Sequence, residues 1–245
     1  MKITTLGTSH GAAERDRFCS SILIEIKDSL YLIDCGAPAS ALIERKGLST
    51  KDLKAVFLTH MHEDHCGTLS AIYKKFTVYH PDKKVIVYFP EEAGIEGFKA
   101  WTKALHMKSE QTSFEFGLTL EGEIYRDDNI IVSACRTYHL REQFPSYSYT
   151  IEAEGKRIVF TGDMGADFWD FPKSATEEHC DLVISEFTHF RPDNIKEAVS
   201  NIAKADADRI IFSHVQNNKS EAVLDYAELF PCPISIASDG DEYVL

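Results

Sequence analysis

The chain contains 245 residues, of which 44% are hydrophobic and 27% charged, a composition typical of a globular protein with enough residues for one large core. Its formal net charge of −13 repels polyphosphate backbones and therefore disfavours general nucleic-acid binding. The six cysteines accompany no signal-peptide segment and no apolar run of membrane-spanning length, so we expect reduced thiols, a cytoplasmic location and no association with a membrane.

The N-terminal part of the chain predicts short strands and one helix. Apolar or alternating runs predict strands at 2–6, 20–26 and 30–33, a helix at 39–46 and a further strand at 53–58. The last of these strands leads into the most informative stretch of the chain.

Four side chains that can bind a metal follow the strand at 53–58 within six residues: His60, His62, Asp64 and His65. Imidazole and carboxylate are ligands that Zn²⁺, Mn²⁺ and Fe²⁺ accept. Alternate residues of a tight turn point the same way, so His60 and His62 can share one metal while Asp64 and His65 serve a second. A polar loop that is merely rich in histidine is the alternative, which this density of ligand types disfavours.

Two helices and a strand are predicted next. The first helix runs from about residue 66 to 76, and Cys66 at its start is better interpreted as a buried thiol than as a fifth ligand. A strand covers 85–89, and a helix starting at Pro90 continues to about Met107. Five residues of this helix predict a stripe that faces the core: Ile95, Phe98, Trp101, Ala104 and Leu105.

One arrangement occurs four times along the chain, in which an apolar strand ends in a chemically active residue: His60, Asp163, Glu186 and His214. The last three follow strands at 156–160, 181–185 and 209–212, and a further buried strand at 130–135 leads to His139. The remaining predicted elements are strands within 113–136, a hairpin strand at 147–152, helices at 193–205 and 220–230, and a final strand at 234–237 before an acidic tail. Strand ends that converge on one edge build the sites of open α/β sheets. No repeat or linker divides the chain, so we expect one domain over residues 1–245.

The pattern His-x-His-x-Asp-His at residues 60–65 resembles the signature of the metallo-β-lactamase-fold hydrolases. The resemblance implies an α/β four-layer αββα sandwich, with two mixed sheets flanked by helices. It also implies two divalent metal ions, with Zn²⁺ the first expectation and Mn²⁺ or Fe²⁺ the alternatives.

Members of this family bring three more metal ligands from later strand ends, and His139, Asp163 and His214 match them in type and order. The resemblance therefore implies a first metal bound by three imidazoles and a second metal bound by two imidazoles and a carboxylate, with Asp163 bridging the two metals. Their ligands would be His60, His62 and His139 for the first metal, and Asp64, His65 and His214 for the second. A hydrogen-bonded core or surface histidine is the alternative for His139.

Two residues near the start of the chain, His10 and Asp34, can each be interpreted in two ways. Asp34 lies in a Leu-Ile-Asp-x-Gly turn of the type that recurs in the family, where it would support a metal ligand by a hydrogen bond. It could instead cap the helix at 39–46. His10 lies on a loop that the family places near the cleft, so it could touch substrate, although a surface histidine is the preferred interpretation.

Within this family, the chain looks most like the branch that contains ribonuclease Z and small cyclic phosphodiesterases. The resemblance rests on the Gly-Thr opening, the Arg17–Ser21 segment, the Ser146–Tyr149 strand, Glu186 and His189. In that branch Glu186 would orient His189 as a general acid, whereas the alternative is that Glu186 only ties down its loop and His189 lies on the surface. Only 23 residues separate His139 from Asp163, too few for the arm with which ribonuclease Z grips tRNA.

We therefore expect a dinuclear metal-dependent hydrolase whose metal-bridging hydroxide attacks a small phosphodiester. Asp64, Glu186 and His189 form the expected catalytic group. The expected partner is a small, anionic substrate molecule. Two alternatives remain, a hydrolase of carboxylic esters, thioesters or lactones, and a metal-binding accessory or sensor protein without turnover. Antibiotic hydrolysis is not expected, because dizinc β-lactamases generally have a secretory leader and lack this Asp-His pair.

Overall fold

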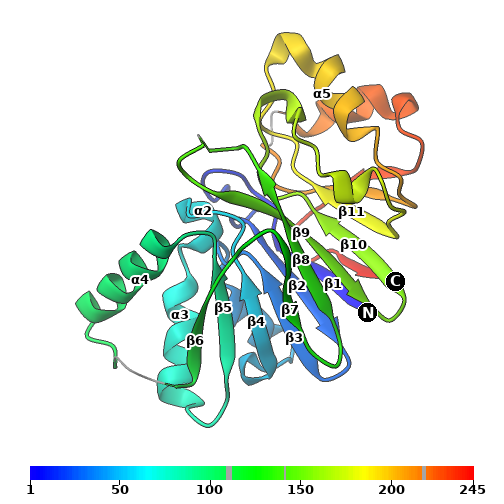
Figure 1. Ribbon diagram of the computed structural model, residues 1–245. Helices are drawn as coiled ribbons and strands as arrows, with labels where there is room; N and C mark the ends of the chain where they lie inside the picture. The colour runs from blue at the N-terminus through cyan, green and yellow to red at the C-terminus, as the bar shows by residue number, and fades with distance from the viewer. Residues whose placement is uncertain (109–111, 141, 217–218) are drawn as a thin grey trace. The chain divides into compact units, whose positions relative to one another are not determined.

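A computed structural model describes residues 1–108, 112–140, 142–216 and 219–245 (Figure 1). The chain divides into two compact units. The first unit comprises Met1–Gly7, Gly11–Thr119 and Asp239–Val244, and the second comprises Thr8–His10, Leu120–Ser238 and Leu245. Each unit contains one seven-stranded sheet. Within the described ranges, no helix combines the length and the apolarity needed to cross a lipid bilayer.

The sheet of the first unit has the strand order β14-β1-β2-β3-β4-β5-β6. Its strands are β1 (Lys2–Gly7), β2 (Ser21–Ile26), β3 (Ser29–Ile33), β4 (Leu53–Phe57), β5 (Val85–Phe89), β6 (Phe114–Leu118) and β14 (Glu242–Val244). Strands β14 to β3 pair antiparallel, whereas β3 to β6 pair parallel, so the sheet is mixed. Parallel strands buried on both faces read as continuous apolar runs, which is why β3 and β4 were readily predicted.

Strand β14 corrects one prediction. The expected acidic tail is partly a strand, in which Val244 lies opposite Lys2 and Glu242 lies opposite Thr4 of β1. The side chain of Lys2 also lies 3.7 Å from the Glu242 carboxylate. A three-residue edge strand has too few positions to show alternation in a sequence, and only its partner β1 makes it a strand.

The helices of the first unit are α1 (Ala39–Arg45), α2 (Glu63–Cys66), α3 (Leu69–Lys74) and α4 (Glu92–Ala104), with a 3₁₀ turn η1 (Thr50–Asp52) and a π-helical turn η2 (Lys75–Tyr79). The single helix predicted at 66–76 is wrong. It is broken after Cys66, where the Thr68 backbone amide donates a 3.0 Å hydrogen bond to the Cys35 carbonyl, outside the helix. The Thr68 hydroxyl also lies 2.9 Å from the Cys35 carbonyl oxygen and 2.5 Å from that of Ala37, so it ties the break to the segment after β3.

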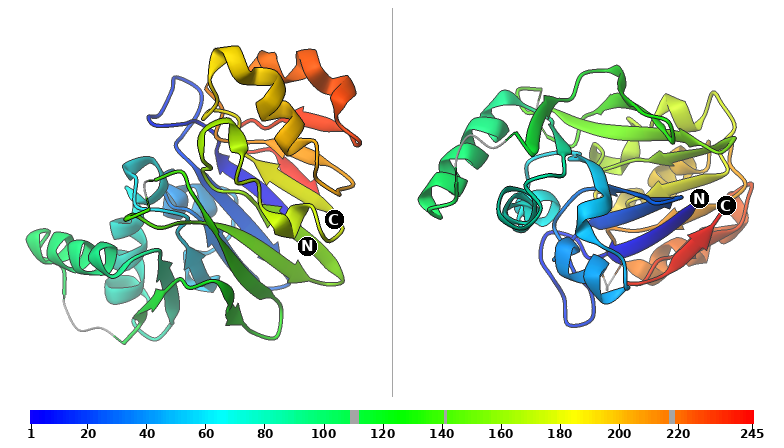
Figure 2. Two further views of the ribbon diagram at one scale, coloured as in Figure 1. Left: turned by 45° about the horizontal axis from the view of Figure 1, so that its top comes forward. Right: turned by 90° about the horizontal axis from the view of Figure 1, so that it is seen from below.

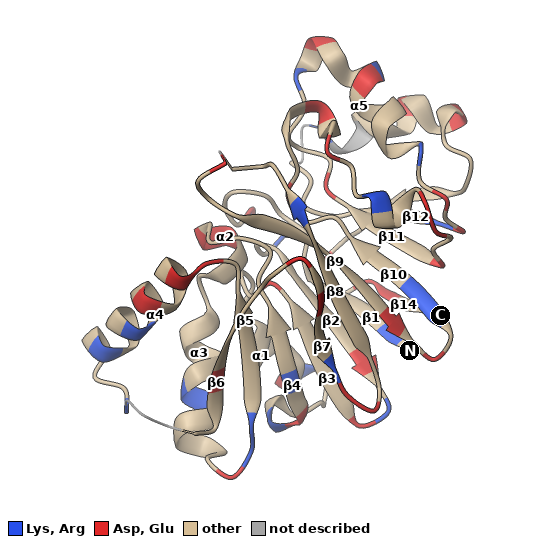
Figure 3. Ribbon diagram, in the orientation of Figure 1, with Lys and Arg blue, Asp and Glu red and all other residues tan. Residues whose placement is uncertain are grey.

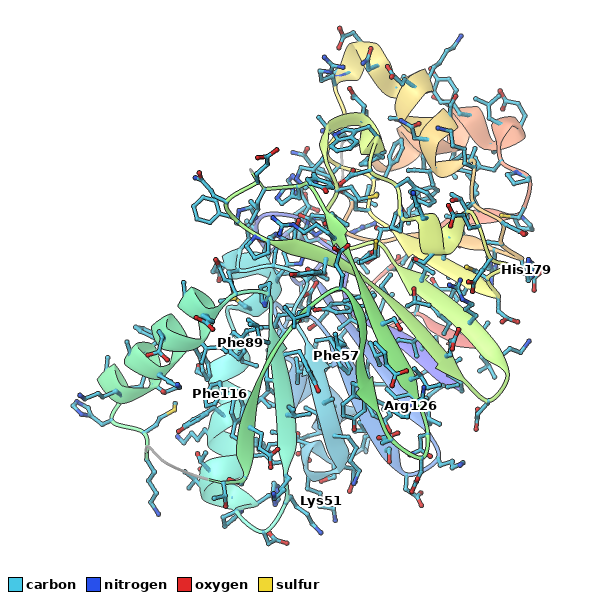
Figure 4. All side chains as sticks on the ribbon, viewed as in Figure 1. Lys51, Phe57, Phe89, Phe116, Arg126 and His179 are labelled. Carbon is cyan, nitrogen blue, oxygen red and sulfur yellow. The ribbon has the colours of Figure 1, made fainter. Side chains whose placement is uncertain are left out.

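Helix α4 meets the core over only part of its length. Phe98 packs with Phe89 and Phe116, both of which are labelled in Figure 4. The centroid of the Phe98 ring lies 5.7 Å from that of Phe89 and 6.3 Å from that of Phe116. Trp101 and Leu105 are 56% and 40% exposed, so the predicted core-facing stripe is wrong beyond Phe98. A helix that leaves the sheet surface cannot bury its later turns, whatever its periodicity.

Charge also follows the direction of α4. Acidic residues lie near its N-terminal end and lysines near its C-terminal end, as Figure 3 shows. Glu92 lies in the first turn and Lys103 in the last, which is the arrangement that complements a helix dipole.

The sheet of the second unit has the order β13-β12-β11-β10-β9-β8-β7. Its strands are β7 (Gly122–Arg126), β8 (Ile131–Thr137), β9 (Ser146–Ala153), β10 (Lys156–Phe160), β11 (Leu182–Ser185), β12 (Ile210–Phe212) and β13 (Ile234–Ile236). Strands β7 to β10 pair antiparallel and β10 to β13 pair parallel. The parallel strands β10, β11 and β12 therefore end at one edge of the sheet, where the sequence predicts reactive residues.

The helical segments of the second unit are short. They comprise α5 (Ile195–Ile202) and the 3₁₀ segments η3 (Ala166–Phe168), η4 (Lys173–Ala175), η5 (Pro192–Asn194) and η6 (Ser220–Leu229). Helix α5 and η6 lie side by side (Figures 1 and 2), and buried Ile202 and Val223 belong to the same core cluster. The helix predicted at 220–230 is thus a 3₁₀ segment with a non-helical residue at Tyr226.

Candidate metal centre

In the first unit, the loop between β4 and α2 brings two histidines together. His60 is fully buried, and its Nε2 lies 2.9 Å from Nδ1 of His62, with ring centroids 4.6 Å apart. The predicted second pair is also close, since Nε2 of His65 lies 3.6 Å from Oδ2 of Asp64. Both partners are buried. The two pairs adjoin each other, since the His60 and His65 rings have centroids 4.1 Å apart, and the division of the four side chains between two metals stays a prediction.

Asp34 fixes the orientation of His65. The Asp34 Oδ2 atom lies 2.7 Å from Nδ1 of His65, and the Thr59 amide donates a 2.8 Å hydrogen bond to Asp34 Oδ1. With Nδ1 directed at Asp34, the His65 ring presents Nε2 to the neighbouring Asp64. Helix α1 is preceded by Pro38 and has no side-chain cap. The alternative that Asp34 caps this helix is therefore wrong.

Gly36 lets the segment after β3 pass next to the predicted ligand loop. A Cβ atom on Gly36 would lie 1.8 Å from the backbone oxygen of Asp64, a distance that no side chain tolerates. The neighbouring Cys35 amide donates a 2.7 Å hydrogen bond to the His65 carbonyl. The Leu-Ile-Asp-x-Gly turn thus holds both the ring and the backbone of the ligand loop.

Replacement of Asp34 by Ala should weaken metal binding about 10- to 100-fold, because a metal-binding imidazole that loses its hydrogen-bonded carboxylate loses both orientation and basicity. Chelator competition with Zn²⁺ measures this affinity directly. Asp28→Ala, which changes an exposed aspartate in the same hairpin, serves as the matched control. Equal affinity in Asp34→Ala and Asp28→Ala would show that Asp34 does not support a metal ligand.

In the second unit, three imidazoles surround the buried carboxylate of Asp163. Its Oδ2 atom lies 3.2 Å from His214 Nε2, 3.7 Å from His139 Nε2 and 3.8 Å from His189 Nδ1. Ligand atoms of Asp163, His189 and His214 all lie within 4.8 Å of one another. One carboxylate among imidazoles is a donor set that suits Zn²⁺, Mn²⁺ or Fe²⁺, so the residues present fit a divalent metal.

Backbone conformation at the strand ends positions these residues. His214 follows β12 with φ = 54°, and Gly162 precedes Asp163 with φ = 59°. This left-handed region is costly for a residue with a Cβ atom, and such strain concentrates at functional sites. The Thr137 hydroxyl at the end of β8 donates a 2.9 Å hydrogen bond to the Asp163 carbonyl, which ties the Asp163 loop to the strand leading to His139.

Glu186 makes both kinds of contact that the sequence left open. Its carboxylate is 2% exposed. It accepts a 2.6 Å hydrogen bond from the Met164 amide and a 3.1 Å bond from the His189 amide, so it ties down two loops. It also lies 2.7 Å from Nδ1 of His189, which it therefore orients. The His189 side chain is 29% exposed, and its role as a general acid stays a prediction.

His10 belongs to the second unit and is half-buried. Its ring lies 5.8 Å from that of His214 and 6.5 Å from that of His189. Burial, and then the positive field of His214, lower the pKa of His10. Contact between His10 and substrate stays a prediction. No periodicity around His10 could have shown its position next to His214, because that placement depends on contacts between distant segments.

Asp170 is a further residue that the sequence did not single out. Its Oδ2 atom accepts a 2.5 Å hydrogen bond from the Tyr138 amide, and its Oδ1 atom accepts a 2.8 Å bond from the Gly165 amide. Burial raises the pKa of this carboxyl group. Asp170 thereby joins the segment that carries His139 to the segment that carries Asp163. Nothing in the surrounding Trp-Asp-Phe sequence signals this role.

Cys66 has the contacts of a thiol. Its Sγ donates to the His62 carbonyl at 3.2 Å, and burial raises the pKa of the thiol to about 11. All six cysteines are free. These observations support the interpretation of Cys66 as a thiol rather than a ligand, since thiolate is the form that binds metal.

Known proteins resemble this chain in sequence and in fold. A family model described as "Anti-Pycsar protein Apyc1" matches residues 1–226. Among curated proteins, ribonuclease Z of Limosilactobacillus fermentum is 28% identical over 158 residues, which cover 62% of this chain and 49% of that protein. The chain therefore spans about half the length of the curated relatives it matches.

Solved structures cover the whole chain at low identity. The metallo-β-lactamase fold protein YhfI from Bacillus subtilis has a TM-score of 0.78 and 20% identity and covers 99% of both chains. The short form of human tRNase Z (ELAC1) has a TM-score of 0.75 and 18% identity and covers 100% of this chain and 99% of its own. Zn²⁺-bound PqqB from Methylobacterium extorquens has a TM-score of 0.73 and 14% identity and covers 100% of both. The predicted metallo-β-lactamase fold is confirmed.

Proposed function

Because this chain belongs to the family of the anti-Pycsar protein Apyc1, we propose that it is a metal-dependent phosphodiesterase that opens the ring of a cyclic nucleotide. The observation that carries the proposal is the carboxylate of Asp163 among the imidazoles of His139, His189 and His214. This donor set suits a divalent cation. A bound cation makes the site locally positive, so an anionic phosphodiester can bind there although the net charge of the protein is −13.

We further propose the ligand assignment that the sequence implies. In this assignment His60, His62 and His139 would hold one metal, Asp64, His65 and His214 would hold the other, and Asp163 would serve both. Zn²⁺ is the first choice, because imidazole and carboxylate ligands are typical of its catalytic sites. When bound, such a metal pair supplies an activated water and stabilises the negative charge that develops on the phosphoryl oxygens.

The residues around Asp163 also provide for the leaving group. Glu186 holds Nδ1 of His189 at 2.7 Å, so the opposite ring nitrogen, Nε2, is the atom that can deliver a proton. The negative charge of an ionised Glu186 stabilises the doubly protonated ring. As the bond from phosphorus to the ribose oxygen breaks, Nε2 of His189 donates its proton to that oxygen, and the ring becomes neutral. The product is a nucleoside monophosphate.

A small substrate fits the sequence better than tRNA does. The 23 residues between His139 and Asp163 provide β9 and β10 and little else. The net charge of −13 opposes a long polyanion, whereas a cyclic nucleotide carries a single phosphate.

The first test is hydrolysis of bis(p-nitrophenyl) phosphate by protein loaded with Zn²⁺ or Mn²⁺, alongside p-nitrophenyl acetate. We expect turnover of the phosphodiester that the chelated protein lacks. Turnover of the acetate alone would move the assignment to carboxylic esters, thioesters or lactones. Absence of turnover with both substrates and both metals would favour a metal-binding protein without enzymatic activity.

A further inference from the structure

Two aromatic side chains of the second unit are stacked in a position where water reaches them. The rings of Tyr138 and Trp169 have centroids 5.2 Å apart and an interplanar angle of 29°. Tyr138 is 44% exposed and Trp169 is 63% exposed. A stacked aromatic pair usually gains most of its stabilisation from burial, so a pair that stays this exposed invites a ligand that completes it.

The stack is held by polar contacts beneath it. Asp170 accepts a 2.5 Å hydrogen bond from the Tyr138 amide, and its other oxygen accepts a 2.8 Å bond from the Gly165 amide. A Cβ atom on Gly165 would lie 2.6 Å from Nε1 of Trp169, so only glycine lets the indole come this close to the backbone. The backbone segments that carry the two rings are therefore tied together before any ligand arrives, which lowers the entropy lost on binding.

The stack also adjoins the residues proposed to hold metal. Tyr138 immediately precedes His139, whose Nε2 lies 3.7 Å from Oδ2 of Asp163. Gly165, against which Trp169 packs, follows Asp163 by two positions. A ligand that rests on the stack therefore lies beside the two segments that carry the proposed phosphate-binding centre.

From this arrangement we propose that Tyr138 and Trp169 form a stacking platform for the nucleobase of the substrate. The inference rests on the proposed function for its ligand class, a nucleotide with one phosphate. Every base has a π-face, so an aromatic platform binds purines and pyrimidines alike without reading their hydrogen-bonding edges. The platform supplies affinity for the base, while the choice among bases falls to other residues.

The two tryptophans of the chain make this proposal testable by fluorescence, because Trp101 and Trp169 are the only ones. In Trp101→Phe, all indole emission comes from Trp169. Titration of the metal-loaded variant with AMP should quench that emission, whereas ribose 5-phosphate, which lacks the base, should leave it unchanged. In Trp169→Phe the remaining Trp101, on α4 of the first unit, should not respond to AMP.

Kinetics with cyclic AMP provide the second measurement. Base–aromatic stacking contributes roughly 1–3 kcal/mol, so Trp169→Ala should raise KM about 5- to 150-fold and leave kcat unchanged. Trp169→Phe, which keeps an aromatic face, should recover most of the affinity. Trp101→Ala, which changes the other exposed indole, should match the wild type in both constants.

The outcomes separate the platform from the proposed function. AMP quenching of Trp169 in a protein that hydrolyses no cyclic nucleotide would support the platform and refute the function. Hydrolysis of cyclic AMP with an unchanged KM in Trp169→Ala would support the proposed function and refute the platform. Emission from Trp169 that changes with protein concentration in the absence of nucleotide would show that the stack contacts a second copy of the chain, and would overturn the proposal.

Discussion

Asp163→Ala should abolish the hydrolysis of phosphodiesters, with a loss of more than about 10²- to 10³-fold, and should lower the bound metal per chain. The physical reason is the position of the carboxylate. Its Oδ2 atom lies within 3.8 Å of a nitrogen of each of three histidines, so its charge is close to all three imidazoles. Removing it takes away a negative charge that helps to balance a divalent cation among them.

Elemental analysis after dialysis measures the metal content, and the phosphodiesterase assay measures turnover on the same samples. Asp128→Ala is the matched control, because it removes an exposed aspartate of the same unit. Circular dichroism of both variants separates loss of metal from loss of fold. Metal content equal to that of the wild type in Asp163→Ala would refute the assignment of this residue as a ligand.

His189→Ala should reduce the turnover of cyclic AMP about 10²- to 10⁴-fold, the usual contribution of a general acid, without reducing metal content. The expected defect depends on the leaving group. A ribose oxygen needs a proton when its bond to phosphorus breaks, whereas p-nitrophenolate is stable as an anion. Bis(p-nitrophenyl) phosphate should therefore be affected much less than cyclic AMP. Glu186→Gln should show the same selectivity, because the amide cannot stabilise a positively charged imidazole.

The structure also defines the competing outcome for His189. Ligand atoms of Asp163, His189 and His214 lie within 4.8 Å of one another, so His189 could bind metal instead of donating a proton. In that case His189→Ala would lose metal, and the turnover of cyclic AMP and of bis(p-nitrophenyl) phosphate would fall by the same factor. His179→Ala is the control, since His179 is an exposed histidine of the same unit that pairs with Asp206 at 2.8 Å (labelled in Figure 4).

Residues at strand ends were the part of the site that the sequence could predict. Strand β10 ends at Phe160, as predicted, and Asp163 follows it in a glycine-flanked turn. A buried apolar strand and a reactive residue just beyond it are both local features of the sequence. The resemblance to the family signature then assigned these residues to one metal site. The same holds for Glu186 after β11 and His214 after β12.

Residues that act through long-range contacts were not predicted. Asp170 joins Tyr138 and Gly165, which lie 32 and five positions away, and no motif marks such a clamp. His10 lies next to His214 although about two hundred residues separate them. Helix α4 shows the opposite failure, because its periodicity predicted burial that the sheet does not provide for Trp101. Periodicity reports which side of a helix is apolar, but the neighbouring elements decide how much of that side is covered.

The most direct test of the account is ³¹P nuclear magnetic resonance of 3′,5′-cyclic AMP incubated with the metal-loaded protein. The account predicts that the cyclic diester signal is replaced by that of a nucleoside monophosphate, and that neither the chelated protein nor Asp163→Ala produces this change. A cyclic AMP signal that persists with both Zn²⁺ and Mn²⁺, in a protein shown to bind two metals, would contradict the proposed cyclic-nucleotide phosphodiesterase.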